Sequence, residues 1–127
     1  MTQRLQVYRC NICGNIVLVL HPGVGTLVCC GQPMQLLTEQ TTETGYEKHL
    51  PVVEPTPTGT KVKVGSTPHP MTPDHHIQWI ELTTEDTLLI KFLQPAQPPE
   101  AEFPIKVEKL QARTYCNLHG LWKTASS

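Results

Sequence analysis

The chain has 127 residues, of which 39% are hydrophobic and 17% are charged, a composition typical of an ordinary folded protein rather than a disordered one. Lys and Arg total 10 and Asp and Glu total 11, so the formal net charge of −1 argues against nucleic acid as a main partner. The longest apolar run covers only residues 16–20, and the first ten residues lack the apolar region of a secretory signal. We therefore expect no membrane segment and a cytoplasmic location.

The first 37 residues are rich in Cys and Gly and contain two short strand-like pieces, NIVLVL and TLVC, around the turn HPGVG. A segment below about 40 residues rarely folds by burial alone and usually needs a metal, disulfides or a partner. The polar run TEQTTETG, residues 38–45, is typical of a linker. We expect a first domain over residues 1–37 and a second over residues 38–127.

Four of the five cysteines form two pairs in this first domain, Cys10 with Cys13 and Cys29 with Cys30. A Cys-x-x-Cys turn directs two thiolates at one point, and two pairs complete a tetrahedral S₄ site for zinc or iron. The second pair is adjacent, so we expect strain and a distorted tetrahedron. An odd number of cysteines in a reducing compartment favours metal binding or catalysis over a disulfide framework.

From residue 49 onward the chain consists of short β-type runs separated by Pro and Gly: LPVVE, TKVKVG, HIQWIEL, TLLIKFL and FPIKVEKLQARTYC. Alternation is clearest in KVKV and PIKVEKL. Twelve prolines and the lack of a 3.6-residue apolar period argue against long helices. This pattern predicts an antiparallel sandwich or small barrel of about seven strands.

A second group of metal-ligating residue types is spread over this region: His49, His69, His75, Cys116 and His119. A single His in a loop is usually solvated, but three of these lie in Pro-rich loops, where β-sandwiches carry their sites. Cys116-x-x-His119 can meet one metal from a tight turn. Imidazoles with one thiolate suit iron, copper or zinc.

The motifs CNICG, CCGQPM, EKHLPV, HPM, HHIQWIEL and YCNLHGLW, in this order along nearly the whole chain, resemble the desulfoferrodoxin family, the two-iron superoxide reductases. The resemblance implies a mainly β protein: a rubredoxin-like domain followed by an immunoglobulin-like antiparallel β-sandwich. It implies two irons per chain, the first held by Cys10, Cys13, Cys29 and Cys30. The second would take His49, His69, His75 and His119 as equatorial ligands and Cys116 as the axial ligand, with His75 favoured over His76.

The resemblance also implies an enzyme that reduces superoxide to hydrogen peroxide by one electron, with the FeCys₄ centre as a candidate electron relay. Rubredoxin or a similar protein would supply the electron, and the family suggests a homodimer. Lys48 would attract the anion, and Glu47 would close the sixth position of the oxidised iron. The family commonly has Glu at the position of Thr114 and often His at that of Leu121, so these two differences bear on redox potential and peroxide release.

Two other classes compete with this interpretation. A blue-copper carrier also places Cys and His on a β-sandwich, but it uses two histidines and a weak axial ligand. A zinc-ribbon interaction module would explain only the N-terminal cysteines. Trp79 and Trp122 are expected to be core aromatics, and His21 to be solvated.

Overall fold

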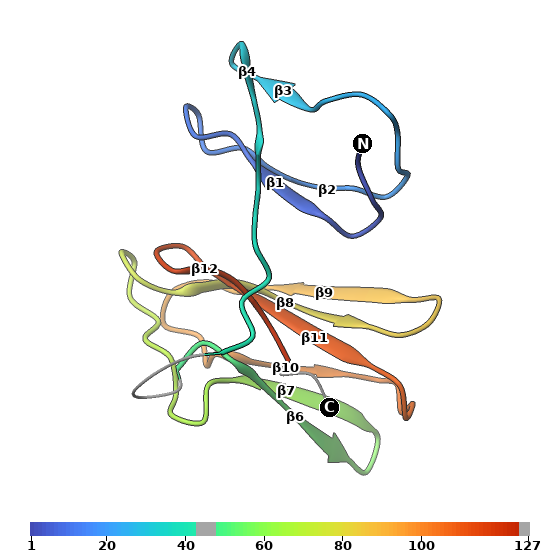
Figure 1. Cartoon of the computed structure of the whole chain (residues 1–127). Helices are drawn as coiled ribbons and strands as arrows, with labels where there is room; N and C mark the ends of the chain where they lie inside the picture. The colour runs from blue at the N-terminus through green and yellow to red at the C-terminus, as the bar shows by residue number, and fades with distance from the viewer. Residues whose placement is uncertain (43–47, 125–127) are drawn as a thin grey trace. The chain divides into compact units, whose positions relative to one another are not determined.

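The computed structural model describes residues 1–42 and 48–124, and the chain divides into two compact units, Met1–Thr38 and Glu39–Ser127. The described residues form strands and turns only, and they include no helix that could cross a membrane. Figure 1 shows the strands along the whole chain. The predicted fold class, a mainly β chain with a small cysteine-bearing unit before a β-sandwich, is confirmed.

The N-terminal unit is made of five very short strands. They are β1 (Val7–Arg9), β2 (Ile16–Leu18), β3 (Val28–Cys29), β4 (Gln32–Pro33) and β5 (Gln35–Leu36). β1 is the central strand of the β2-β1-β5 sheet, and β3 pairs with β4 in a separate hairpin. The only hydrophobic side chains buried among the described residues of this unit are Val7, Cys10 and Val19. So small a core agrees with the expectation that this unit needs a metal to fold.

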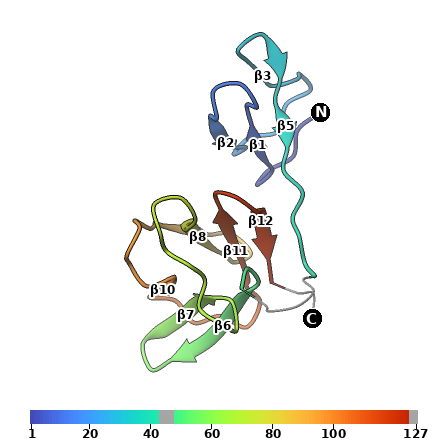
Figure 2. The ribbon, with the colours of Figure 1, turned by 90° about the vertical axis from the view of Figure 1, so that its left-hand side faces the viewer.

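The C-terminal unit consists of two antiparallel sheets, which Figures 1 and 2 show as two layers. Its strands are β6 (Pro51–Thr56), β7 (Gly59–Val64), β8 (Ile77–Thr83), β9 (Leu88–Phe92), β10 (Glu100–Phe103), β11 (Gln111–Cys116) and β12 (Gly120–Lys123). One sheet has the order β10-β7-β6 and the other β12-β11-β8-β9. Four of the predicted runs correspond to β6, β7, β8 and β9, and the C-terminal end of the fifth corresponds to β11.

The run PIKVEKL, residues 104–110, is not a strand although its residues alternate. It forms an irregular connection between β10 and β11, and Ile105 and Leu110 pack against the core from it. The Ile105 carbonyl accepts a hydrogen bond from Thr60 Oγ1 at 2.7 Å, so a side chain satisfies this carbonyl in place of a strand partner. The prediction of a continuous strand here was wrong: Ile105 packs against the core but Val107 is exposed, so the alternation of this run does not mark one buried face of a strand.

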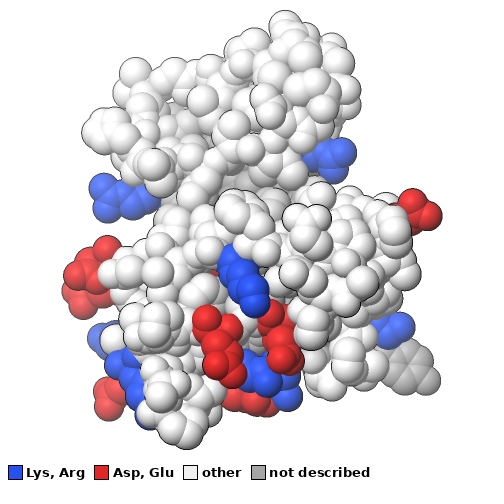
Figure 3. Space-filling model, turned by 180° about the vertical axis from the view of Figure 1, so that it is seen from behind, with Lys and Arg blue, Asp and Glu red and all other residues white. Residues whose placement is uncertain are grey.

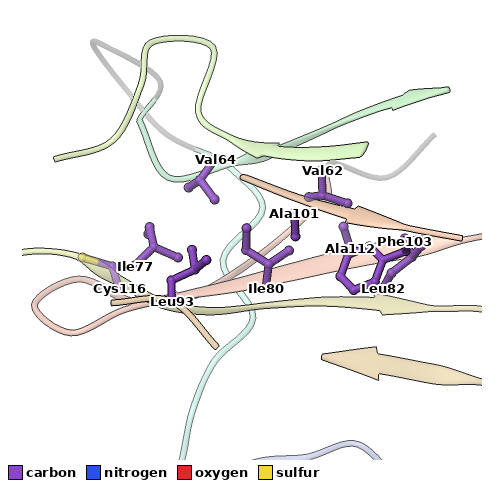
Figure 4. Packing of buried hydrophobic residues seen from close by; sticks show 10 residues of the cluster. All are labelled: Val62, Val64, Ile77, Ile80, Leu82, Leu93, Ala101, Phe103, Ala112 and Cys116. Carbon is purple, nitrogen blue, oxygen red and sulfur yellow. The ribbon is translucent and has the colours of Figure 1, made fainter. Parts of the chain in front are cut away.

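The core lies between the two sheets. Val62 and Val64 point from β7 toward Ile77 and Ile80 of β8, as Figure 4 shows, and Leu82 lies further along the same layer. These five side chains are at most 1% exposed. Cys116, at the end of β11, belongs to the same cluster, so one predicted metal ligand is anchored directly in the core.

A buried ion pair fixes the start of the C-terminal unit. The Arg113 guanidinium on β11 donates to Glu81 Oε1 on β8 at 2.6 and 3.0 Å and to Glu39 Oε2 at 3.1 Å. Removing one partner of such a pair costs about 3–5 kcal/mol, because the other charge stays buried. The contact holds residue 39 beside the sheet, and the next residue, Gln40, pairs with Trp122 of β12.

Figure 3 shows acidic and basic side chains intermixed on one face, in agreement with the near-neutral net charge.

Candidate metal centres

The four N-terminal cysteines lie at the tips of two hairpins. Cys10 and Cys13 lie in the connection between β1 and β2, whereas Cys29 ends β3 and Cys30 begins the turn that leads to β4. Their sulfur atoms all lie within 4.8 Å of one another. The Sγ atoms of Cys13 and Cys29 are 3.6 Å apart and those of Cys29 and Cys30 are 4.0 Å apart. A tetrahedron with metal–sulfur bonds of about 2.3 Å has edges of about 3.8 Å, so these spacings fit an S₄ metal site.

The adjacent pair reaches this geometry through an unusual backbone. Cys30 has φ of 54°, in the left-handed region that few side-chain-bearing residues adopt. This turn directs two consecutive sulfurs toward one point, where an extended backbone would direct them to opposite sides. The strain expected from the adjacent cysteines is therefore located at Cys30.

The protons of this cluster are unevenly shared. Hydrogen bonds from the backbone N–H groups of Cys13 and Ile12 lower the pKa of Cys10 to about 6. Hydrogen bonds with the sulfurs of Cys13 and Cys10 raise the pKa of Cys30 to about 12. The four thiols cannot all ionise side by side without a cation, and a metal ion held by the four sulfurs would supply that charge.

The second group of predicted ligands meets at one end of the sandwich. His49 precedes β6, His75 precedes β8, Cys116 ends β11 and His119 lies in the turn before β12. One ligand atom from each of these four residues lies within 4.8 Å of the other three. His49 Nε2 is 3.0 Å from His119 Nδ1, and Cys116 Sγ is 3.8 Å from the same nitrogen. The Cys-x-x-His turn thus places both side chains at one point.

His69, the remaining predicted ligand, lies beside this group. It is on the connection between β7 and β8, and its ring centroid is 4.7 Å from those of both His49 and His75. His69 Nδ1 donates to the Pro70 carbonyl at 2.7 Å, so the neutral ring carries its lone pair on Nε2. That atom is buried and has no hydrogen-bond partner, and neither has Nε2 of His75. Buried lone pairs without partners fit metal ligation, and burial lowers the pKa of His69 to about 4, which keeps the ring neutral.

Burial differs across the site. Cys116 is fully buried, His49 and His69 are buried, and His119 is exposed. Burial raises the pKa of the Cys116 thiol, and the backbone N–H groups of Leu118 and His119 oppose this effect. The thiol therefore faces the core, whereas the imidazole of His119 lies where solvent and small solutes can reach it.

Lys48 lies beside the histidines, but Glu47 falls outside the described residues. The pKa of His75 is lowered first by burial, and the charges of His119, His49 and Lys48 lower it further. The Lys48 ammonium therefore acts electrostatically on the candidate site. His76, the alternative to His75, is not part of the cluster of ligand atoms found among the described residues.

Several side chains that hold the site in place were not expected from the sequence. Trp122 is buried, as predicted for a core aromatic, and in addition its ring stacks on His49 with centroids 4.9 Å apart and its Nε1 donates to the His119 carbonyl at 3.2 Å. Gln40 Nε2 donates to the same carbonyl at 2.8 Å. Thr114, one of the two differences from the family pattern, is fully buried and donates to the His49 carbonyl at 3.1 Å.

Gly65 allows two segments that carry the site to approach each other. It has φ of 83°, and its N–H donates to the Leu50 carbonyl at 2.9 Å. A Cβ atom at this position would lie 2.7 Å from Lys48 Cα and 2.5 Å from the Thr67 carbonyl oxygen. A glycine is therefore required where the Lys48–His49 segment passes the connection that carries His69.

Comparison with known proteins agrees with this arrangement. Residues 41–125 match the desulfoferrodoxin family model and residues 2–37 match the model of its N-terminal domain. The chain is 57% identical to a desulfoferrodoxin homolog of Methanothermobacter thermautotrophicus over 96% of this chain and 99% of that protein. It is 54% identical to the desulfoferrodoxin of Desulfarculus baarsii over 97% and 98% of the two chains.

Among solved structures, the superoxide reductase from Treponema pallidum superposes with a TM-score of 0.78 at 31% identity, over 96% of this chain and 98% of that one. The family models together match both units, and the resemblance read from the motifs is confirmed. The chain, with its Cys₄ cluster and its cluster of histidines around one cysteine, belongs to the desulfoferrodoxin family.

Proposed function

We propose that this chain is a superoxide reductase that converts superoxide to hydrogen peroxide at an iron centre in the C-terminal unit. The observation that carries the proposal is the convergence of ligand atoms from His49, His75, Cys116 and His119, with His69 beside them. These are the imidazole and thiolate donors that transition metals prefer.

Iron is the metal that we propose for both centres. The candidate site offers four histidines and one cysteine, whereas a blue-copper carrier uses two histidines, one cysteine and a weak axial ligand. A zinc-ribbon module would leave the second cluster without a role. The cluster geometry in the N-terminal unit suits iron as well as zinc, and membership of the desulfoferrodoxin family supports iron there.

The reaction consumes one superoxide, one electron and two protons and yields one hydrogen peroxide. Ferrous iron, when bound, supplies the electron to superoxide, and the Cys116 thiolate donates electron density to the metal. The chain contributes the ligands, and it holds Cys116 on the core side while His119 lies at the solvent side. Solvent at the exposed side can deliver the protons.

Lys48 attracts the anionic substrate in this proposal. The chain carries a net charge of −1, so long-range attraction for an anion is lacking and a local positive charge must provide it. The influence of Lys48 on His75 supports this role. Glu47 remains a prediction, as the residue that would occupy the sixth position of the oxidised iron.

The electron donor is proposed to be rubredoxin or a similar protein, with the FeCys₄ centre as the relay. The exposure of Cys13 and Cys30 supports this route, because electron transfer requires a metal near the surface. Anaerobic mixing of reduced rubredoxin with the oxidised chain tests it. Reduction of both centres agrees with the proposal, and reduction of neither rejects this donor.

A homodimer and a cytoplasmic location complete the proposal. The location rests on the sequence, whose first ten residues lack the apolar region of a secretory signal. Light scattering would report twice the mass of the 14.2 kDa chain for a dimer and once that mass for a monomer. Cell fractionation tests the location, and recovery of the chain outside the cytoplasmic fraction would reject it.

The stoichiometry of the products tests the reaction itself. Superoxide is generated anaerobically in the presence of the reduced, iron-loaded chain and an electron donor, and peroxide and oxygen are counted. A reductase gives one peroxide for each superoxide and releases no oxygen. A dismutase gives one peroxide for every two superoxides and releases oxygen, and that result would reject the proposal. The Cys116→Ser variant is the control for reaction away from this site.

A further inference from the structure

Asn117 lies between two predicted ligands on the β11–β12 turn, and its contacts extend across to another loop. Its side-chain Oδ1 accepts a hydrogen bond from the His76 backbone N–H at 2.9 Å. Its Nδ2 donates to the Asp74 carbonyl at 2.9 Å. Its backbone N–H donates to the His76 carbonyl at 3.2 Å. The three bonds enclose His75 on both sides.

The loop that carries His75 is otherwise held by its own local turn and by Met71, which packs against the core and accepts a hydrogen bond from the Ala96 N–H at 2.8 Å. Thr72 and His75 exchange backbone hydrogen bonds at 3.0 and 3.2 Å, and Thr72 Oγ1 also contacts the backbone of His75. These contacts shape the loop but do not fix it to the Cys116–His119 turn. Pairing of β8 with β11 continues only to Cys116 and Ile77, and the register shifts just before that pair.

We propose that Asn117 is a positioning residue that sets the spacing between His75 and the Cys116–His119 turn before a metal binds. This inference rests on the proposed function, since it holds that the Asn117 hydrogen bonds support the ligands of the second iron. The Asn117 side chain bonds the two segments just beyond Cys116 and Ile77, the last pair of β11 with β8. It donates and accepts at once, so one side chain holds the residues before and after His75. Metal sites need such support because an ion binds tightly only where its ligands are already spaced correctly.

The test compares Asn117→Ala with a matched variant, Thr60→Val, in the full-length iron-loaded chain. Thr60 also makes a partly buried hydrogen bond from its side chain to a backbone carbonyl, but it lies at the opposite end of β7 from Gly65 and the site. The reduced proteins are incubated anaerobically with a ferrous chelator. Iron at the second centre is followed by the iron–thiolate absorption of oxidised aliquots, and folding by thermal unfolding.

We expect Asn117→Ala to release the second iron about tenfold faster than the native chain, the lower end of losses seen when groups that support metal ligands are removed. Its iron–thiolate band should shift or broaden, while release from the Cys₄ centre stays unchanged. Thr60→Val should lower the unfolding temperature and leave iron release unchanged.

If Asn117→Ala does not fold, Asn117→Asp replaces it. That variant retains the acceptor for the His76 N–H, and we expect release about threefold faster, as for the loss of one hydrogen bond.

The outcomes separate this inference from the proposed function. A native chain that holds no second iron overturns both. A native chain that holds the iron and reduces superoxide, with release and spectrum of the Asn117 variant equal to those of Thr60→Val, overturns the positioning role alone.

Discussion

In the N-terminal unit, all four sulfur donors come from two hairpin tips between residues 10 and 30, whereas the donors of the C-terminal unit come from segments spread over residues 49 to 119. The first cluster therefore depends on local turns, and only three hydrophobic side chains are buried among the described residues around it. The second depends on a sandwich that brings distant loops to one end, with Cys116 anchored in its core. From this difference we expect the first site to need its metal in order to fold and the second to be present before its metal arrives.

Metal removal should have the largest effect and should separate the two units. Stripping both ions is expected to unfold the N-terminal unit, since structural tetrahedral sites supply on the order of 10 kcal/mol of folding free energy. The C-terminal unit should stay folded. Amide hydrogen exchange measures this: Val7 and Val19 should lose protection, and Ile80 and Leu82 should keep it. Equal loss of protection in both units would refute the contrast.

Replacing the buried thiolate, Cys116→Ser, should abolish function without unfolding the C-terminal unit. A hydroxyl is a harder ligand and is largely protonated, so the iron–thiolate band of the second centre should disappear. We expect superoxide reduction to fall by about 100-fold or more, since even the partners of ligands cost up to 100-fold. Stopped-flow spectroscopy and circular dichroism measure the two effects. Normal turnover in a variant that still holds iron would exclude the axial role.

Gly65→Ala tests whether the packing of the sandwich positions the second site. A Cβ there would collide with the backbone of Lys48 and Thr67, and φ of 83° is unfavourable for alanine. We expect a loss of about 1–3 kcal/mol in the free energy of unfolding together with weaker metal binding. Chemical denaturation and metal titration measure these quantities. The control is Gly25→Ala, where a Cβ meets no atom within 4 Å. Equal effects in the two variants would contradict the claim that close packing at Gly65 positions the second site.

Lys48→Ile should give the smallest effect and should act only on the encounter with superoxide. With the ammonium roughly 7 Å from the anion and an effective dielectric near 20, the Coulomb energy is about 2 kcal/mol, which screening lowers. We expect the bimolecular rate constant to fall about five- to tenfold, its salt dependence to weaken, and the iron spectrum to stay nearly unchanged. The control is Lys109→Ile, which makes the same change in net charge. Lys109 precedes the first residue of β11, at the end of that strand away from Cys116. Pulse radiolysis at two salt concentrations decides, and identical rates for the two variants would deny Lys48 its role.

The sequence was most informative where structure is local. The cysteine pairs and the apolar runs of β6 to β9 could be read directly, because turn spacing and strand patterns depend on neighbouring residues. The run PIKVEKL is not a strand, because its alternation does not mark one buried face: Ile105 packs against the core, whereas Val107 is exposed. The short β12 lacks β-branched residues, and it becomes a strand through its pairing with β11.

The second site could be assembled from the sequence only through the family resemblance, since nothing local brings His49 beside His119 seventy residues later. The supporting residues escaped prediction for the same reason. Trp122 stacks on a ring far away in the chain, and Asn117 binds a loop 41 residues earlier. The Asn within the Cys-x-x-His turn is itself a signal of such a contact, because Asn often bonds to backbone groups in turns.

The most direct test of the account is the reaction of Cys13→Ser with superoxide, measured by pulse radiolysis together with iron analysis. The two centres belong to separate units, so the variant should lose the first iron, retain the second, and react with superoxide at the rate of the native chain. Loss of that reaction while the second iron stays bound and reducible would mean that the Cys₄ centre takes part in the chemistry, and it would contradict the division between the two units.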